Sequence, residues 1–163
     1  MDYGIRPMSA TDAQAVCQCR YPGEYGFYDM DADPDDLREF LNFEGWEPDT
    51  KFAVTDGSGE LVGFYEFVTR DGVTEVGLGL RPDLAGHGLG REFLRFGLRF
   101  GLRFAAERFR PRRFKLAVVT FNQRAITVYE RVGFAITQRF VQNTNAGHYE
   151  FVEMEADPTS LSL

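Results

Sequence analysis

The feature that most constrains this chain is the run from residue 75 to residue 94, where an apolar strand pattern leads through a glycine-rich loop into a long helical pattern. The strand pattern ends at Arg81-Pro82, and the loop contains Gly86, Gly88 and Gly90. Glycines let backbone N–H groups approach a ligand closely, and the unpaired N–H groups and dipole of a helix N-terminus favour negative charge. The run therefore predicts a phosphate site, although turns and helix starts also use glycine for purely structural reasons.

A second motif follows the apolar strand pattern of Phe114–Thr120. Residues 121–134 read FNQRAITVYERVGF, which predicts a short amphipathic helix with Asn122 as its N-cap and Gly133 as its C-terminal stop. Taken together, the two motifs resemble the GNAT superfamily of N-acetyltransferases, whose members carry a glycine loop after the fourth strand and an Asn…Ala…Tyr-Glu-x-x-Gly-Phe helix after the fifth. The resemblance extends over roughly Ile5–Glu155.

The length of 163 residues predicts one domain over 1–156 and a short C-terminal tail over 157–163. No apolar run reaches the ~18 residues needed to span a bilayer, and the first residues lack the basic and apolar regions of a signal peptide. The only cysteines, Cys17 and Cys19, lie too close on a predicted helix to form a disulfide or a metal pair. These observations predict a reduced, cytoplasmic protein that does not bind a membrane.

The pattern of elements predicts the order β-α-α-β-β-β-α-β-α-β-β. This is an α+β fold of GNAT type, with a mixed, mostly antiparallel sheet of six to seven strands and helices on both faces. The strands are expected at Tyr3–Pro7, Lys51–Thr55, Leu61–Thr69, Val73–Leu80, Phe114–Thr120, Ala135–Val141 and Tyr149–Met154. The helices are expected at Asp12–Arg20, at Pro34–Phe43, from the glycine loop toward Pro111, and after Asn122. Tyr21–Asp33 is expected to be a loop and Asn143–Gly147 a turn.

The charge of the chain argues against nucleic acid as a partner. The net charge is −7, whereas proteins that bind nucleic acid take most of their affinity from neutralising phosphates. Arg95, Arg99 and Arg103 recur every four residues and form a basic stripe on the long helix, which patterning favours as its solvated face. The phenylalanines that follow these arginines, at positions 96, 100 and 104, share another face, and most phenylalanines are expected in the core.

The resemblance implies acetyl-CoA as the acetyl-donor co-substrate. Its pantetheine arm is expected to lie along the backbone of the fourth strand in the manner of an added β-strand, and its diphosphate to bind the glycine loop. Positive groups near this loop are Arg81, His87, Arg91 and Arg124. The cofactor-binding residues implied in this way are Leu78, Gly79, Leu80, Gly86, His87, Gly88, Leu89, Gly90, Arg91 and Asn122. The family loop usually begins with Gln or Arg where this chain has Ala85, so one side-chain contact to the cofactor is expected to be lost.

Two catalytic roles follow from the resemblance. Tyr129 is expected to protonate the departing thiolate, because a phenol of pKa near ~10 can donate a hydrogen bond to a thiolate whose conjugate pKa is near ~8.5. A backbone N–H near Leu80 is expected to stabilise the oxyanion. Glu75 is a candidate base for the amine proton, but a shift of one residue along a strand reverses the face of a side chain, so a surface or cross-strand pairing role stays equally open.

The function implied is transfer of acetyl from acetyl-CoA to a primary amine of a small molecule or peptide, directly within a ternary complex. Glu24, Tyr25 and Tyr28 are expected to line the acceptor site, between the 21–33 loop and the last two strands. The alternative is a catalytically silent acyl-CoA-binding sensor or interaction module. By analogy with relatives, a homodimer is one assembly open to the chain.

Other chemistries lack their motifs. Asp29, Asp31 and Asp33 begin like a calcium loop, but Pro34 and Phe40 stand where glycine and a carboxylate are required. The two histidines have no partner at metal-ligand spacing, so no metal is expected, and neither a P-loop nor a Gly-x-Ser-x-Gly elbow is present.

Overall fold

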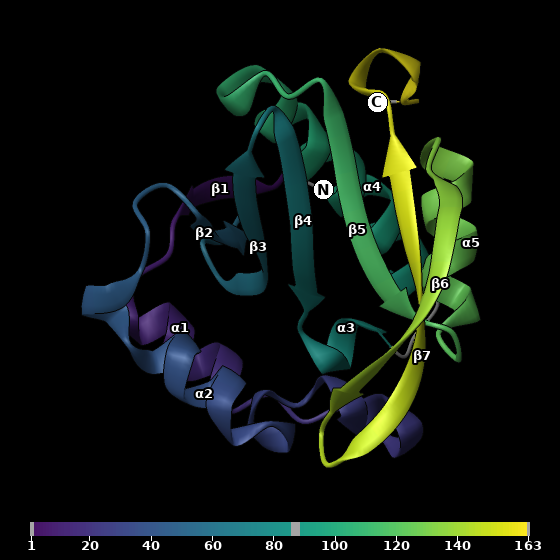
Figure 1. Cartoon of the computed structure of the whole chain (residues 1–163). Helices are drawn as coiled ribbons and strands as arrows, with labels where there is room; N and C mark the ends of the chain where they lie inside the picture. Colours follow the sequence, from purple (N-terminus) through teal and green to yellow (C-terminus); the bar gives the residue numbers. More distant parts are fainter. Residues whose placement is uncertain (1, 86–88, 163) are drawn as a thin grey trace. The chain divides into compact units, whose positions relative to one another are not determined.

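The computed structural model describes residues 2–85 and 89–162. Seven strands form one mixed sheet in the order β1-β2-β3-β4-β5-β7-β6 (Figure 1). The strands are β1 (Gly4–Pro7), β2 (Lys51–Thr55), β3 (Leu61–Arg70), β4 (Val73–Leu80), β5 (Arg113–Val119), β6 (Ala135–Thr144) and β7 (Gly147–Ala156). The α-helices are α1 (Ala10–Cys17), α2 (Pro34–Leu41), α3 (Pro82–Ala85), α4 (Leu89–Phe109) and α5 (Gln123–Val132). The predicted α+β class with a mostly antiparallel sheet is confirmed, and β2 and β4 have their predicted bounds.

The described residues fall into two compact units, 2–66 with 78–85 and 67–77 with 89–162. The first unit contains β1, β2, the start of β3 and the end of β4. The second contains the remaining parts of β3 and β4 together with β5, β7 and β6. Pairing is parallel between β4 and β5, and antiparallel in β1–β2, β2–β3, β5–β7 and β6–β7.

Helix α1 begins with a capping box. Ser9 is the N-cap; its hydroxyl accepts from the Asp12 N–H at 3.2 Å, and the Asp12 carboxylate accepts from the Ser9 N–H at 2.8 Å. Arg6 on β1 donates to the same carboxylate, with its Nη2 2.9 Å from Oδ1. The Asp12 side chain is 9% exposed, so this ion pair joins β1 to the helix start in a mostly buried place. Chiefly through the Arg6 hydrogen bond, the pKa of Asp12 is lowered to about 2.

The lowered pKa predicts a pH-dependent contribution to stability. An Asp that titrates near 4 in the unfolded chain and at about 2 in the folded one stabilises the fold above pH 4, and this is lost as the pH falls through about 2. We expect Asp12→Asn to reduce the free energy of unfolding by about 1–2 kcal/mol at pH 7, allowing for screening of the half-exposed Arg6. In urea titrations the difference between the variant and the wild type should shrink as the pH falls below 4 and approach zero only below about pH 2; a constant difference would contradict this.

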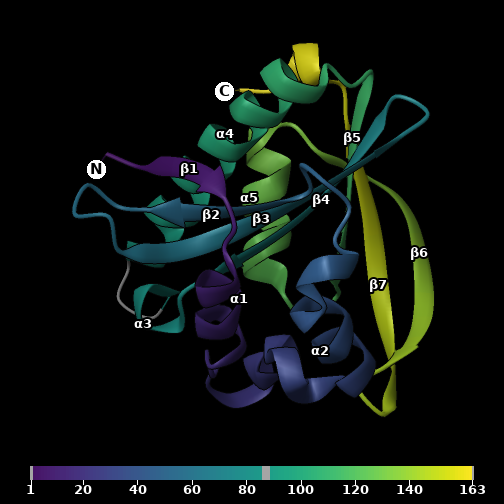
Figure 2. The same ribbon diagram turned by 90° about the vertical axis from the view of Figure 1, so that its left-hand side faces the viewer.

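One core cluster of the first unit includes residues of helices α1 and α2, which lie side by side (Figure 2). Its buried members are Met8, Ala13, Val16 and Phe40. Helix α2 begins with the predicted proline at its first turn, and its N-cap Asp33 accepts from the N–H groups of the next turn. Because apolar residues alternate with exposed ones at helical spacing, both helices bury one face and leave the other in water.

The stretch Tyr21–Asp33 departs from the predicted irregular loop. It contains two 3-10 helices, Gly23–Tyr28 and Met30–Ala32. The Asp29 carboxylate accepts from the N–H of Tyr21 at 2.8 Å, which closes the segment on itself. Three aromatic side chains in the segment contact one another edge to face: Tyr21 with Tyr28 at 6.3 Å and Phe27 with Tyr28 at 5.3 Å between ring centroids. These ring contacts give the segment regular structure that its Pro and Gly content did not indicate.

Helices α4 and α5 pack against each other in the second unit (Figure 2). Strand β5 supplies Phe114, Leu116 and Val118 to the core, all at most 5% exposed, and β7 supplies Val152 and Met154. Alternate residues of both strands are therefore buried, as in a sheet with one face covered.

The buried stripe of α4 differs from the predicted one. Leu98, Leu102 and Ala105 are at most 1% exposed, whereas Phe100 and Phe104 are only half-buried. The four-residue repeat places leucines and phenylalanines on adjacent stripes, and the smaller leucines occupy the tightest part of the interface. Gly97 and Gly101 are buried as well, so a helix face of small residues lies against its neighbours.

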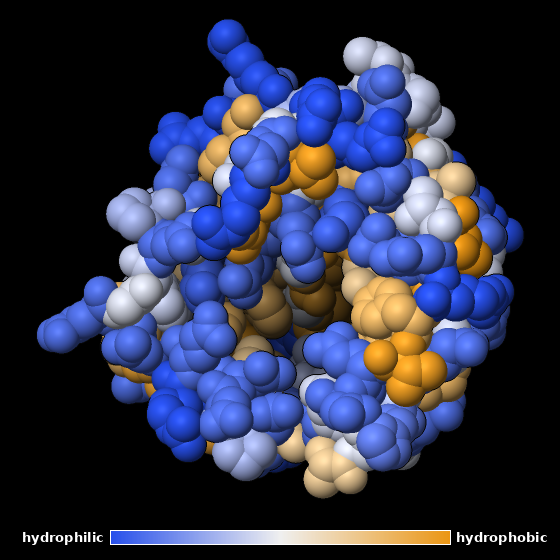
Figure 3. Space-filling view, viewed as in Figure 1, coloured by the Kyte–Doolittle hydropathy of each residue, from blue (hydrophilic) through white to orange (hydrophobic). Residues whose placement is uncertain are grey.

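The last two strands are longer than predicted, and their turn is shorter. Strands β6 and β7 pair up to Thr144 and Gly147, so only Asn145 and Ala146 form the turn, both with positive φ, at 50° and 58°. Consecutive positive φ values are typical of a type I′ hairpin, whose twist matches that of the strands. Most of β6 is exposed, and Val141 is 66% exposed, so apolar residues interrupt the otherwise hydrophilic surface seen in Figure 3.

Candidate active site

Strands β4 and β5 pair over only a short distance. Their parallel register comprises Val73↔Arg113, Thr74↔Phe114 and Glu75↔Lys115. Both strands continue beyond this point, β4 to Leu80 and β5 to Val119. Within the described residues of the second unit, the backbone groups that follow Glu75 on β4 do not pair with β5. Such groups are available to hydrogen-bond a ligand in the way that an added strand does.

Glu75, the candidate base, lies on the exposed face of β4. Its neighbours Thr74 and Val76 are buried, and alternation along the strand turns Glu75 to the opposite side. Lys115 is its partner in register, and the Lys115 ammonium lies 3.6 Å from the carboxylate of Glu153. The position therefore suits cross-strand charge pairing. The role of Glu75 as a base stays a prediction.

The end of β4 carries the predicted cofactor residues Leu78, Gly79 and Leu80. A Cβ added to Gly79 would stand 2.2 Å from a ring carbon of Phe64, far inside contact distance. A Cβ added to Gly63 would lie 2.6 Å from the carbonyl oxygen of Gly79. Both glycines are thus required for the close approach of β3 to β4 and of the Phe64 ring to the strand.

Tyr21 fixes the last residue of β4, a contact that the sequence did not reveal. Its hydroxyl donates to the carbonyl oxygen of Leu80 at 2.7 Å, across 59 residues of sequence. Burial raises the pKa of Tyr21 above its ordinary value, with smaller contributions from Cys19 and Asp29. The hydroxyl therefore stays protonated and remains a donor at physiological pH.

The Tyr21 hydroxyl is open to a direct test. We expect Tyr21→Phe to lower the free energy of unfolding by about 1 kcal/mol, because the half-buried Leu80 carbonyl loses its donor while the aromatic ring remains. Tyr21→Leu, which also removes the ring contact with Tyr28, should cost more. Urea denaturation of the two variants separates the hydroxyl from the ring; Tyr21→Phe with wild-type stability would show that the bond is not stabilising.

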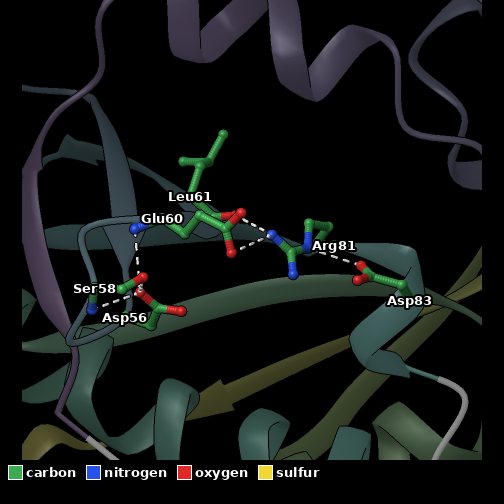
Figure 4. Close-up of polar contacts among 6 residues, drawn as sticks. All are labelled: Asp56, Ser58, Glu60, Leu61, Arg81 and Asp83. Atoms are coloured by element: carbon green, nitrogen blue, oxygen red, sulfur yellow. Dashed lines mark hydrogen bonds and ion pairs between the residues drawn. The ribbon is translucent and has the colours of Figure 1, made fainter.

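Arg81 follows directly and is held by carboxylates. Its Nε lies 2.8 Å from Asp83, and its Nη1 lies 3.4 Å from Glu60 and 3.2 Å from the carbonyl oxygen of Leu61 (Figure 4). The Asp83 hydrogen bond is the main reason that the pKa of Arg81 is raised. Arg81 thus keeps its positive charge and is paired with carboxylates; its role beside the loop stays a prediction.

A cavity of about 250 Å³ adjoins the end of β4 in the first unit. It is formed by the last turn of α1 and the residues after it, the start of β3 and the end of β4. Its walls are mostly apolar, and its lining residues are Ala15, Val16, Cys19, Tyr21, Glu60, Leu61, Val62, Gly63, Phe64, Gly79, Leu80 and Arg81.

Most of the predicted diphosphate loop lies outside the described residues: Gly86, His87 and Gly88 are not part of them. The backbone of Leu89, Gly90 and Arg91 forms the first turn of α4, a helix of 21 residues. The first turn of any α-helix leaves N–H groups without helical partners, which fits the predicted anion site. The short helix α3, Pro82–Ala85, was not predicted and lies between the strand and the loop.

Helix α5 carries the second motif as predicted. Asn122 is its N-cap and accepts from the Ala125 N–H at 3.2 Å; Gly133 ends it with φ of 126°. Tyr129 is 8% exposed, and its ring lies 6.1 Å from that of Phe134. The chain end supports this helix terminus, because Ser162 donates its N–H to the carbonyl of Val132 at 2.9 Å. The C-terminal residues include a 3-10 turn at Pro158–Ser160.

The predicted acceptor residues all lie on the first 3-10 helix of the 21–33 segment. Glu24 and Tyr28 are exposed, and Tyr25 is half-buried. Tyr28 contacts Tyr21, which in turn holds Leu80. No cluster of three or more metal-ligating side chains occurs among residues 2–85 and 89–162. In the same residues, no helix combines the length and apolarity needed to cross a membrane.

Comparison of the fold with solved structures defines its class. Spermidine N-acetyltransferase from Vibrio cholerae in complex with CoA and spermine superposes with a TM-score of 0.75 at 18% identity, covering 97% of this chain and 96% of that one. A dodecameric form of the same enzyme gives 0.71 at 20% identity, covering 96% and 94%. At these identities the likeness establishes the fold, which is that of N-acetyltransferases.

The sequence gives the family. Residues 3–135 match the Acetyltransferase (GNAT) domain, and the chain therefore belongs to the GNAT acetyltransferase family. A mycothiol acetyltransferase from Streptomyces avermitilis is 36% identical over 95 residues, which are 56% of this chain and 29% of that protein. The chain thus matches less than a third of the length of this relative.

Proposed function

We propose that the protein is an acetyl-CoA-dependent N-acetyltransferase that transfers acetyl directly to a primary amine of a small molecule or peptide within a ternary complex. The observation that carries the proposal is the three-residue pairing of β4 with β5, in a chain whose family is established. A parallel pair that ends early leaves main-chain groups to bind a ligand. The related Vibrio cholerae structure contains CoA and spermine, which supports both substrates of the proposed reaction.

In this proposal acetyl-CoA binds mainly through the main chain. Leu78–Leu80 hydrogen-bond the pantetheine arm, and the N–H groups of residues 86–91 bind the diphosphate, with Asn122 contributing from the start of α5. Arg81 is already bound by Glu60 and Asp83. The diphosphate is therefore bound more by the backbone N–H dipoles than by side-chain charge. Ala85 removes one further side-chain contact without affecting these donors.

Acetyl transfer changes the charge on three groups: the amine, the carbonyl oxygen and the sulfur. The acceptor must lose its proton to become a nucleophile, and this proton passes to Glu75 or to water. The amine nitrogen then bonds to the thioester carbonyl carbon, and the oxygen gains charge that an N–H near Leu80 stabilises. As the C–S bond breaks, the sulfur takes up a proton from Tyr129, while the nitrogen gives up its second proton, which returns by way of solvent to the Tyr129 phenolate; the products are the N-acetylated amine, CoA and the regenerated phenol.

Tyr129→Phe tests the proposed acid. We expect kcat to fall about 100-fold, the lower end for loss of a general acid, while the affinity for CoA changes less than about twofold. The ring contact with Phe134 is kept, so the melting temperature should change little. Phe134→Leu is the matched control, because it disturbs the packing around Tyr129 and keeps the phenol. An equal loss of kcat in both variants would show that packing, not the hydroxyl, limits turnover.

Turnover itself is tested by release of free thiol. The purified protein and acetyl-CoA are mixed with spermidine, spermine, amino acids, aminoglycosides and peptides, and CoA binding is measured by calorimetry in parallel. We expect heat of binding for CoA and thiol release above background for at least one amine. Binding without release for every amine would instead favour the alternative, a silent acyl-CoA sensor. Absence of CoA binding at millimolar concentration would remove both functions.

A further inference from the structure

The cavity beside the end of β4 differs in character from the charged surface around it. Every residue that lines it belongs to the first unit, and its apolar walls come from Val16, Leu61, Val62, Phe64 and Leu80. Two of its lining residues, Ala15 and Glu60, are exposed and therefore mark its mouth.

The polar groups in the lining are already engaged with protein partners. The Tyr21 hydroxyl donates to Leu80, and the Cys19 thiol lies 3.6 Å from the carbonyl oxygen of Ala15. The Arg81 guanidinium is held by Asp83, Glu60 and Leu61. A ligand that brings its own charge would have to break one of these contacts or remain unpaired, which is costly inside a cavity. The cavity is therefore suited to an uncharged, apolar group.

The lining also argues against a polycation in this cavity. Glu60 is the only carboxylate among the lining residues, and Arg81 binds it from the same lining. A polyamine carries several ammonium groups, each of which needs an acidic or carbonyl partner when it leaves water. This lining does not supply such partners, even though the related Vibrio cholerae enzyme is described with spermine.

We propose that the cavity receives an apolar group of the acceptor, so that the preferred substrate is a primary amine attached to an aromatic ring or a branched aliphatic chain. The inference rests on the proposed N-acetyltransferase function. Gly79 and Leu80 belong both to the cavity wall and to the stretch of β4 proposed for the cofactor arm, so an occupant of the cavity lies next to that arm. The volume is adequate, since an apolar cavity of about 150 Å³ holds benzene and this one measures about 250 Å³.

A series of amino-acid amides measures the preference. From glycinamide through alaninamide and valinamide to leucinamide and phenylalaninamide, kcat/KM is expected to rise about 4-fold for each methylene buried, corresponding to about 0.8 kcal/mol. Spermidine should fall below leucinamide. A flat series, or a preference for spermidine over every apolar amide, would overturn the inference and leave the acetyltransferase function intact.

Two substitutions on α1 locate the effect. Ala15→Trp places a large side chain at the cavity mouth and should lower the ratio of kcat/KM for leucinamide over glycinamide at least about tenfold. Gln14→Trp is the matched control: it adds the same side chain at the adjacent exposed position, which does not line the cavity, and should leave the ratio unchanged. An equal change in both variants, or in neither, would contradict the assignment.

Binding of indole provides a readout that does not need turnover. Saturation-transfer NMR on the unmodified protein should detect indole at millimolar concentration; Ala15→Trp should abolish the signal, and Gln14→Trp should keep it. Binding that leucinamide displaces and CoA does not supports the acceptor assignment, and if no amine is turned over, only the proposed enzyme function fails. Displacement by CoA would assign the cavity to the cofactor, and absence of indole binding would remove the site; either outcome overturns the proposal.

Discussion

The end of β4 is held within the first unit by a hydrogen bond from the hydroxyl of Tyr21 to the carbonyl of Leu80. On the other side, the Arg81 N–H donates to Val62 at 2.9 Å and ties the strand end to β3. A segment that offers main-chain groups to a ligand must be held by contacts that leave those groups available. The Tyr21 bond occupies the carbonyl of Leu80, so the cofactor arm must use other main-chain groups of Leu78–Leu80.

This requirement also explains why glycines lie where β3 and β4 meet. Gly63 and Gly79 allow the two backbones and the Phe64 ring to approach more closely than any side chain permits. Glycine inside a strand costs conformational entropy. The close approach offsets this entropy cost by placing the Phe64 ring against the strand, where the ring also forms part of the cavity wall. The geometry of the strand end and the presence of the cavity therefore have a common origin.

Local signals in the sequence account for most of the elements. The capping residue Asn122 and the stop at Gly133 each act over three or four residues, and the structure contains both as predicted. The Tyr21–Leu80 bond could not be predicted in this way, because it joins residues 59 positions apart and no periodicity encodes it. In the β6–β7 turn, Ala146 adopts positive φ without the usual glycine or asparagine, so the turn had no signature at that position.

The four-residue repeat of α4 shows a different limit. A repeat close to the helical period predicts which residues share a stripe, but it does not say which of two adjacent apolar stripes packs most tightly. Leu98 and Leu102 form the most deeply buried stripe, because a narrow interface accommodates leucine and the neighbouring glycines better than phenylalanine. Similarly, the sequence placed the positive charge of Arg81 near the loop but did not indicate its ion pair with Glu60, 21 residues away.

Charge therefore acts at two length scales in this protein. The net charge of −7 creates a field that attracts ammonium groups from solution, which affects the rate of encounter. At the end of β4, by contrast, the carboxylates of Glu60 and Asp83 both bind Arg81, and the adjoining cavity has mostly apolar walls. Long-range attraction is shared by all amines, so it cannot by itself select one. In the proposed reaction, selection among amines must therefore come from short-range contacts, which we assign to the mostly apolar cavity beside the strand.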